Sequence, residues 1–423
     1  MPKLGSPGIA DTQPSTSWLR RLSRTTPGVI GMIALAVAAC CVIAGVVCAA
    51  QLNARIDERN AVLTRSEPFA YAAQNLYAAL SAADAAAASA FLSGGIETAP
   101  MRAQYQQALA RAASALADAT AGTTDIQTRT AMAKISEQLA AYTALVEAAR
   151  ANNRQNHVIG SAYLREASSL MQTSLLPEAE KVYTGNLATV EEDQRAIGSL
   201  PIVSLALLAL ALAAIAAGSV IMYRRTNRQF NIGLVVAGAT VVLVIGWLVV
   251  ATQLAAGEIE RSRTEGTERF EQLAKARILA QKARTDETVE LIARSDISET
   301  EKSFYGHMNE LGKLLEAAPT AAKDGVQKWT ASHRKQTEAY EGGDYDAAVA
   351  QAIGPDPAAS AAQFATVESS LRDEIERTRE TLRERVSSAG AWLAWSPTGT
   401  LVLMVVAASA AFVGLWPRLK EFL

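Results

Sequence analysis

The amino-acid sequence predicts an all-α membrane protein with four transmembrane helices and two extracytoplasmic antiparallel helical-bundle domains in a tandem, duplicated layout. Three observations predict this fold: four long hydrophobic runs without charge, helical periodicity between them, and the absence of strand patterns. Half of the 423 residues are hydrophobic, and the net charge is −2. This balanced composition excludes a disordered chain and a polycationic nucleic-acid-binding protein.

The four hydrophobic runs lie at residues 28–50, 199–222, 232–254 and 396–416. None contains Asp, Glu, Lys, Arg or His, and each is long enough to cross ~30 Å of hydrocarbon at ~1.5 Å per residue. The first run has an alternative interpretation as a cleaved signal peptide ending near Val47-Cys48-Ala49. Because it is long for the hydrophobic part of such a peptide, we expect a retained span.

The segments that flank the spans, residues 1–27, 223–231 and 417–423, are basic and contain only two acidic residues. Cytoplasmic flanks carry the excess of Lys and Arg in membrane proteins. The sequence therefore predicts a multi-pass protein of the cell membrane with both termini in the cytoplasm and with residues 51–198 and 255–395 outside. The cations expected to contact anionic lipid or a cytoplasmic partner are Arg20, Arg21, Arg24, Arg224, Arg225, Arg228, Arg418 and Lys420.

The two outer blocks are predicted to be helical. Apolar residues recur every three or four positions from Phe364 to Val386, as in an amphipathic helix. Each block is divided by helix breakers into an antiparallel four-helix bundle whose first and last helices continue into spans. In the first block, Thr124 or Asp125 caps the third helix, and the fourth helix is kinked near Pro177. The breaks are Ser93-Gly94-Gly95, Ala121–Thr124, Asn152–Gly160, Ser295-Asp296, Ala318-Pro319-Thr320, Gly342-Gly343 and Gly354–Pro357.

The two halves of the chain are predicted to be repeats. Asp84 precedes Phe91–Gly94 at the same spacing by which Asp286 precedes Ala293–Asp296, and the order of span, bundle and span occurs twice. Both aspartates lie among small residues. Each is either a solvated polar position or a buried polar contact that sets the register of neighbouring helices.

The sequence predicts neither an enzyme nor a cofactor or metal site. His157, His307 and His333 are far apart and are each expected to be solvated or to lie at a helix end. Phosphate-binding loops, nucleophile elbows and zinc-protease motifs are absent from the sequence. All three cysteines lie in the first hydrophobic run, so the outer blocks contain no disulfide.

Two resemblances point to signalling. Residues 76–94, from Leu76-Tyr77 through Ala83-Asp84 to Phe91-Leu92-Ser93-Gly94, resemble the first-helix signature of the outer four-helix-bundle sensor domains of bacterial chemoreceptors and histidine kinases. The chain departs from those receptors because it lacks their cytoplasmic kinase or coiled-coil region. The whole chain resembles actinobacterial GlnX-type membrane proteins through Gly160–Ser168, Leu175-Leu176-Pro177, Ala293–Asp296 and Gly343-Asp344-Tyr345. That resemblance implies two partners, a periplasmic glutamate/aspartate-binding protein (GlnH-like) and a cytoplasmic Ser/Thr kinase (PknG-like).

The membrane-distal tips are the predicted contact sites for a ligand or partner. If the first helix continues from the bilayer to residue 92, its far end lies beside the turn at residues 153–160. Arg and Tyr side chains there suit a protein interface or a carboxylate ligand, although solvated helix ends carry the same residues. The predicted outer-tip contacts are Ser93, Gly94, Gly95, Arg102, Tyr105, Arg154, His157, Tyr163, Arg165, Arg294 and Asp296.

These features favour a non-catalytic transmembrane sensor. The resemblance implies that it relays extracytoplasmic glutamate or aspartate availability, through a solute-binding protein, to a Ser/Thr kinase. The alternative is a structural or scaffolding protein of the cell envelope without ligand-dependent states. A transporter is disfavoured because the spans lack ionisable residues at mid-membrane. The sequence leaves the oligomeric state open, a homo-oligomer included.

Overall fold

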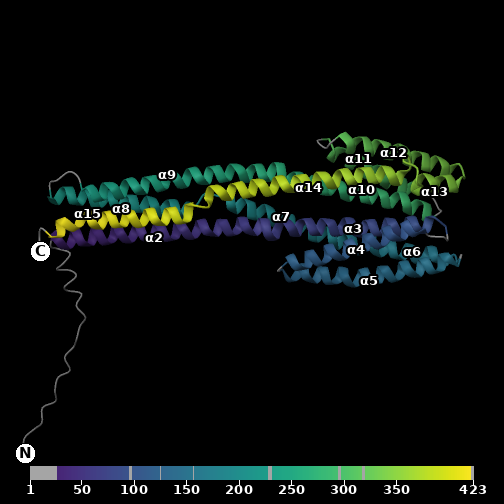
Figure 1. Ribbon diagram of the computed structural model, residues 1–423, viewed down its shortest axis with the longest axis horizontal. Helices are drawn as coiled ribbons and strands as arrows, with labels where there is room; N and C mark the ends of the chain where they lie inside the picture. Colours follow the sequence, from purple (N-terminus) through teal and green to yellow (C-terminus); the bar gives the residue numbers. More distant parts are fainter. Residues whose placement is uncertain are drawn as a thin grey trace, which may run out of the picture. The chain divides into compact units, whose positions relative to one another are not determined.

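The computed structural model describes residues 26–420 except 95–97, 124, 156, 227–230, 294–296 and 317–319. Helices make up nearly all of this part of the chain and no strand occurs in it, which confirms the all-α prediction (Figure 1). The chain forms two compact units. The first comprises Met1–Ile56, Ser199–Ala256 and Gly390–Leu423, and the second comprises Asp57–Gly198 and Gly257–Ala389.

The first unit contains the predicted spans. Its helices are the N-terminal parts of α2 (Thr26–Ala61) and α9 (Ile232–Arg261), together with α8 (Ile202–Thr226) and α15 (Ser396–Lys420). Within the described residues, four helical segments are long and apolar enough to cross a membrane, and each contains one predicted span. These segments are Gly28–Leu92, Ile159–Arg224, Ile232–Ile292 and Ser360–Pro417.

Small residues let two of the spans approach closely. A Cβ atom built on Gly233 of α9 would lie 2.5 Å from the Cα of Gly414 in α15, so a larger side chain does not fit there. At the same crossing, Asn231 Nδ2 donates a hydrogen bond to the Gly414 carbonyl oxygen at 2.9 Å. Ala237, one turn further along α9, is fully buried. Gly233 and Ala237 therefore lie at a helix–helix contact of the kind that small residues provide in membranes.

The first half of the second unit is built from α3 (Glu67–Leu92), α4 (Ala99–Gly122), α5 (Ile126–Arg154), α6 (Ile159–Leu170) and α7 (Leu176–Gly198). Gly94, with φ of 73°, reverses the chain after α3. Asp125 caps α5, as predicted, because its carboxylate accepts a hydrogen bond from the Thr128 backbone N–H at 2.7 Å. Immediately before Pro177 the helix widens into a π-helical turn, η2 (Met171–Leu175).

The second half contains α10 (Glu268–Ala293), α11 (Ser298–Leu314), α12 (Thr320–Glu341), α13 (Tyr345–Ile353) and α14 (Ser360–Leu393). The prediction of four helices in this block is wrong, because the short helix α13 is a fifth. Gly343, with φ of 81°, makes the turn into α13, and the Asp344 carboxylate caps it by accepting from the Ala347 N–H at 3.0 Å.

The duplicated layout is visible in the order of elements. Two π-helical turns, η1 (Val62–Ser66) and η3 (Ser262–Thr267), precede α3 and α10, and both of these helices have 26 residues. The predicted continuity into the spans holds only for the first helix of each half. Residues 199–201 interrupt the helix between α7 and α8, and residues 394–395 do so between α14 and α15.

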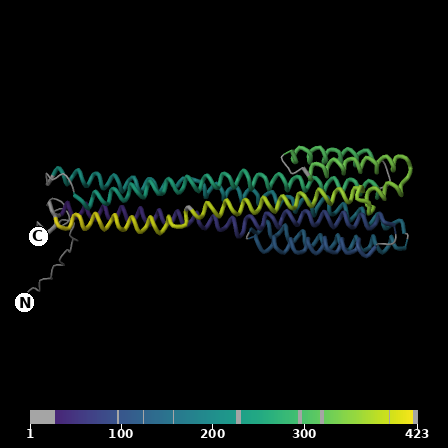
Figure 2. The backbone as a smooth tube through the Cα atoms, turned by 45° about the horizontal axis from the view of Figure 1, so that its top comes forward, coloured from purple at the N-terminus to yellow at the C-terminus, as the bar shows by residue number. Residues whose placement is uncertain are grey.

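The two halves of the second unit share one core, rather than forming separate domains. Buried side chains of both, among them Tyr77 and Tyr183 from the first half and Phe270 and Trp329 from the second, belong to one hydrophobic cluster. The helices α3 and α10 contact each other. Figure 2 shows α4 and α5 of the first half, in blue, and α11 and α12 of the second half, in green, on opposite sides of α3 and α10.

Candidate functional site

The structure brings together part of the predicted outer tip in the first half. Ser93 and Gly94 follow the end of α3, and the Phe91 carbonyl oxygen accepts a hydrogen bond from Asn153 Nδ2 at 3.4 Å, which places the ends of α3 and α5 side by side. The side chains of Arg102, Arg154, His157, Tyr163 and Arg165 are exposed there. Gly95, Arg294 and Asp296 lie outside the described residues.

Tyr105 departs from the prediction of an outer contact. It is 3% exposed, belongs to the hydrophobic core, and lies with its ring centroid 5.3 Å from the Arg150 guanidinium carbon. Tyr105 lies in the second turn of α4 and contacts α5 from within the core, so it does not offer an exposed surface at the tip.

The sequence prediction missed two exposed apolar residues at this tip. Val158 is 90% exposed and Ile159 is 53% exposed, at the junction between α5 and α6. Exposed apolar side chains rimmed by polar ones are typical of interaction surfaces. Both residues follow His157 directly in the sequence. An apolar pair inside a turn that is otherwise polar is the sequence feature that could have identified them. We call Arg154, His157, Val158, Ile159, Tyr163 and Arg165 the tip surface.

The predicted cytoplasmic cations lie at helix ends where the structure describes them. Arg224 and Arg225 are in the last turn of α8, and Arg418 and Lys420 are at the end of α15. Arg224 is exposed. Arg20, Arg21, Arg24 and Arg228 fall outside the described residues.

A small pocket of about 260 Å³ lies next to the tip surface and contains Asp84. Its walls come from both halves, with Leu164 and Arg165 of α6 on one side and Val289 and Ile292 of α10 on another. Asp84 is 3% exposed, which decides between the two sequence interpretations in favour of the buried polar contact. Polar and apolar side chains both line the pocket, as they do in sites that bind small molecules.

Three side chains hold the Asp84 carboxyl group. Tyr142 Oη donates to Asp84 Oδ1 at 3.3 Å, and Ser168 Oγ and Gln172 Nε2 donate to Oδ2 at 2.8 and 3.2 Å. Gln172 Nε2 also lies 3.4 Å from Thr285 Oγ1 of α10. Because Gln172 belongs to the π turn η2, this turn connects Asp84 with the second half.

Burial raises the pKa of Asp84 above its ordinary value, although the three hydrogen bonds oppose the shift. A group whose pKa rises on folding contributes its full stability below its unfolded-state pKa and loses it as the pH rises through the folded-state value. The Asp84→Asn variant should therefore gain stability relative to the unmodified chain from about pH 4 upward, by at most about 1.4 kcal/mol per pH unit. Thermal unfolding from pH 4 to 7 measures this difference. The exposed Asp118→Asn substitution on α4 is the control, and parallel curves for Asp84→Asn and the unmodified chain would contradict the assignment.

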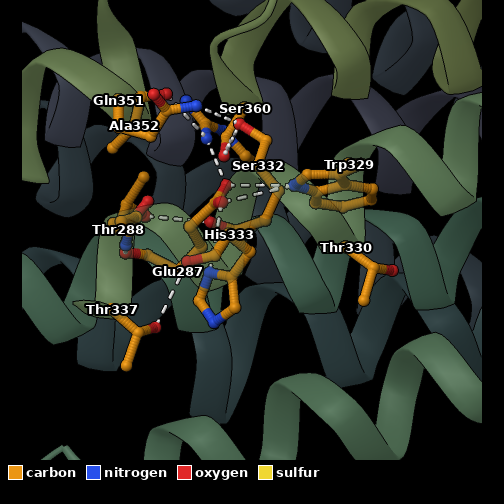
Figure 3. A network of polar contacts seen from close by, with 12 residues as sticks. Glu287, Thr288, Trp329, Thr330, Ser332, His333, Thr337, Gln351, Ala352 and Ser360 are labelled. Atoms are coloured by element: carbon orange, nitrogen blue, oxygen red, sulfur yellow. Dashed lines mark hydrogen bonds and ion pairs between the residues drawn. The ribbon is translucent and has the colours of Figure 1, made fainter. Parts of the chain in front are cut away.

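A larger polar network in the second half was not predicted. Its centre is Glu287, which is fully buried and forms an ion pair with Arg284 one turn earlier on α10. Trp329 Nε1 donates to its two carboxylate oxygens at 3.3 and 3.2 Å, and His333 Nδ1 lies 3.3 Å from Oε1. Figure 3 shows Glu287, Trp329 and His333 pointing toward one another.

The prediction that His333 is solvated or caps a helix is wrong, because its side chain is 0% exposed. Its ring stacks on Phe304 with centroids 3.6 Å apart, and its Nε2 lies 3.0 Å from Glu301 Oε1. Burial alone lowers the pKa of His333, but the bonds to Glu287 and Glu301 outweigh burial and raise the pKa to about 9. His157 is exposed, as expected, and His307 Nδ1 pairs with Asp286 Oδ2 at 2.8 Å.

Asp286 is not the structural counterpart of Asp84, although the repeat places them at equivalent positions. The Asp286 side chain is 20% exposed, and the next residue, Glu287, takes the buried position instead. No hydrophobicity pattern distinguishes the two, because α10 is polar along most of its length.

Part of the chain matches a known protein family. Residues 58–195 match the family model of an actinobacterial sensor domain. No curated protein and no solved structure matches the chain. The matched segment covers about a third of the chain and includes the tip surface, Asp84 and the π turn η2. The match and the four candidate spans support a multi-pass membrane protein with a sensor role.

Proposed function

We propose that this chain is a non-catalytic transmembrane sensor that relays extracytoplasmic glutamate or aspartate availability to a cytoplasmic Ser/Thr kinase. The observation that carries the proposal is the position of the sensor-domain match, residues 58–195, between the first two uncharged hydrophobic runs, residues 28–50 and 199–222. A domain in that position is connected to the membrane at both of its ends. The amino-acid ligand and the kinase come from the resemblance to GlnX-type proteins.

The tip surface is the proposed docking site for a solute-binding protein. It combines the cationic side chains of Arg154 and Arg165 with the exposed apolar side chains of Val158, Ile159 and Tyr163. Arginine and aromatic side chains are enriched in protein interfaces, and an apolar centre surrounded by charged groups is the usual arrangement. A partner with an acidic rim around an apolar patch would fit this surface.

Signal transmission is proposed to begin at the π turn η2. The tip surface continues through α6 into η2, where Gln172 contacts both Asp84 of α3 and Thr285 of α10. Single π turns inside helices are frequent at functional sites. A partner that binds one register better than the other shifts the population toward it by its difference in affinity, typically 1–3 kcal/mol.

The helices that could carry a displacement into the membrane are those without a break. The segments Gly28–Leu92 and Ile232–Ile292 are helical throughout, whereas residues 199–201 and 394–395 interrupt the other two. The basic ends of α8 and α15, together with the basic N-terminal segment, are the proposed contacts for the kinase. These same cations fix the proposed orientation with both termini in the cytoplasm.

The proposal is tested by inserting two Gly residues at Asn53, within the continuous helix α2. Flexible residues there should abolish the change in kinase-substrate phosphorylation that follows addition of glutamate to cells, while a crosslinked binding protein is still captured at the outer surface. The matched control is the same insertion at Trp395, where the helix is already interrupted, and it should keep most of the response.

An unchanged response after insertion at Asn53 would contradict transmission along α2. Capture of a kinase that ignores extracellular glutamate, with no change in phosphorylation, would contradict the sensor function and favour the envelope scaffold. Protease added to intact cells tests the orientation, because cleavage near Tyr105 and Lys328 only after lysis would place both halves of the second unit in the cytoplasm.

A further inference from the structure

Three side chains from consecutive helices meet in the second half, outside the segment that matches the sensor domain. Glu290 comes from α10, Glu301 from α11 and His333 from α12. One ligand atom of each residue, a carboxylate oxygen or an imidazole nitrogen, lies within 4.8 Å of the ligand atoms of the other two. Two ligands of one tetrahedral zinc ion are about 3.4 Å apart, given bonds of about 2.1 Å. The 3.0 Å separation of His333 Nε2 and Glu301 Oε1 is already close to that value.

The buried carboxylate of Glu290 lacks hydrogen-bond partners among the described residues around it. It is 1% exposed, and neither of its carboxylate oxygens has a hydrogen-bond partner among the described residues, although the nearby Gln336 amide favours its charged form. A buried carboxylate without partners costs several kcal/mol unless a cation or proton compensates it. The Glu290 carboxylate faces His333 and Glu301. A cation held by those two groups would therefore also compensate the buried charge of Glu290.

His333 is held in the orientation that metal-binding histidines adopt. Its Nδ1 faces the buried Glu287 carboxylate at 3.3 Å, and its ring stacks on Phe304. Histidine ligands usually donate the N–H of one ring nitrogen to such a carboxylate, which fixes the tautomer and presents the other nitrogen to the metal. Thr337 Oγ1 donates to Glu301 Oε1 at 2.5 Å and orients the second ligand in the same way.

Charge also favours a divalent cation. Glu287, Glu290 and Glu301 together carry three negative charges, and Arg284 carries one positive charge. A divalent ion that displaces the proton from His333 Nε2 and binds the neutral imidazole would bring the sum of these charges to zero. Glu301 is 20% exposed, so the cluster reaches solvent along one edge through which an ion can enter.

We propose that Glu290, Glu301 and His333 form a binding site for a divalent first-row transition-metal cation, which ties α10, α11 and α12 together. One imidazole and two carboxylates match Zn²⁺ and its neighbours better than Mg²⁺ or Ca²⁺, which prefer oxygen ligands alone. The proposal is independent of the sensor function, because it concerns only the second half of the chain.

The test measures Zn²⁺ binding to the full chain in detergent, without an affinity tag, after treatment with a chelator. Equilibrium dialysis followed by elemental analysis should give one tightly bound Zn²⁺ per chain that excess Mg²⁺ does not displace. The isosteric variants Glu290→Gln and Glu301→Gln should each weaken binding at least about 100-fold, because even loss of a residue that only orients a ligand costs 10- to 100-fold. Glu301 is partly exposed, so its variant tests the site even if substitution at Glu290 disturbs folding, which helical circular dichroism reports.

The matched control is His307→Gln. It removes the imidazole of His307 on α11, which pairs with the Asp286 carboxylate on α10. This variant should keep the bound Zn²⁺. Equal Zn²⁺ content in the unmodified chain and the two Glu variants would place the metal elsewhere and overturn the proposal. Absence of stoichiometric Zn²⁺ from the unmodified chain, or its displacement by Mg²⁺, would overturn it as well.

Discussion

Replacing Glu287 with Gln is expected to lower the free energy of unfolding by about 3–5 kcal/mol. Glu287 is 0% exposed. Its carboxylate compensates the positive charge of the buried Arg284 and also pairs with Nδ1 of His333. The substitution keeps the volume of the side chain but removes its charge, so Arg284 loses its ion pair and keeps its hydrogen bond to the Ala352 carbonyl oxygen at 3.3 Å. Burying a guanidinium without a counter-charge costs more free energy than a hydrogen bond to the neutral Gln amide restores.

Chemical unfolding of the detergent-solubilised chain, followed by circular dichroism, measures this loss. The control is Glu299→Gln, which removes an exposed carboxylate at the start of α11 and should change stability by no more than about 0.5 kcal/mol. A loss below about 1 kcal/mol for Glu287→Gln would contradict the prediction. It would show that water enters the network or that the side chains around Arg284 repack.

Replacing Arg277 with Met is expected to destabilise the contact between the two halves by a similar amount, about 3–5 kcal/mol. Arg277 of α10 donates through Nε to Glu368 Oε1 of α14 at 2.7 Å, and through Nη1 to Gln74 Oε1 and Asn75 Oδ1 of α3 at 3.0 and 3.1 Å. Both members of the ion pair are nearly buried, with side-chain exposures of 7% and 11%. Removing Arg277 leaves the Glu368 carboxylate buried with the Gln281 amide as its remaining close donor at 3.1 Å.

The same Glu368 provides the matched control. Arg372 also pairs with Glu368, at 3.6 Å, but its side chain is 49% exposed, so Arg372→Met should cost less than about 1 kcal/mol. The double substitution Arg277→Met with Glu368→Leu should recover much of the stability, because an apolar pair needs no compensation for desolvation. Equal effects of Arg277→Met and Arg372→Met would contradict a contribution that depends on burial.

The spans and the helices follow from local features of the sequence. Uncharged runs of about 20 residues identify the spans because hydrocarbon excludes charge at any point along a run. Gly94, Asp125 and Gly343 mark helix ends because a positive φ or a capping carboxylate acts within a few residues of itself. The same reasoning found Asp84, which lies in an alanine-rich stretch where a single acidic residue is conspicuous.

The sequence by itself therefore determined the helical class, four candidate spans, the duplicated order of elements and Asp84 as a position of interest. Only the tertiary structure decided that both halves share a core, that Tyr105 and His333 point inward, and that Glu287, Glu290, Glu301 and His333 meet. The physical reason lies in α10, whose charged residues resemble a solvated helix face until α3, α11 and α14 cover them. Which polar side chains become buried depends on contacts between helices far apart in the chain, and no local pattern of hydrophobicity records those contacts.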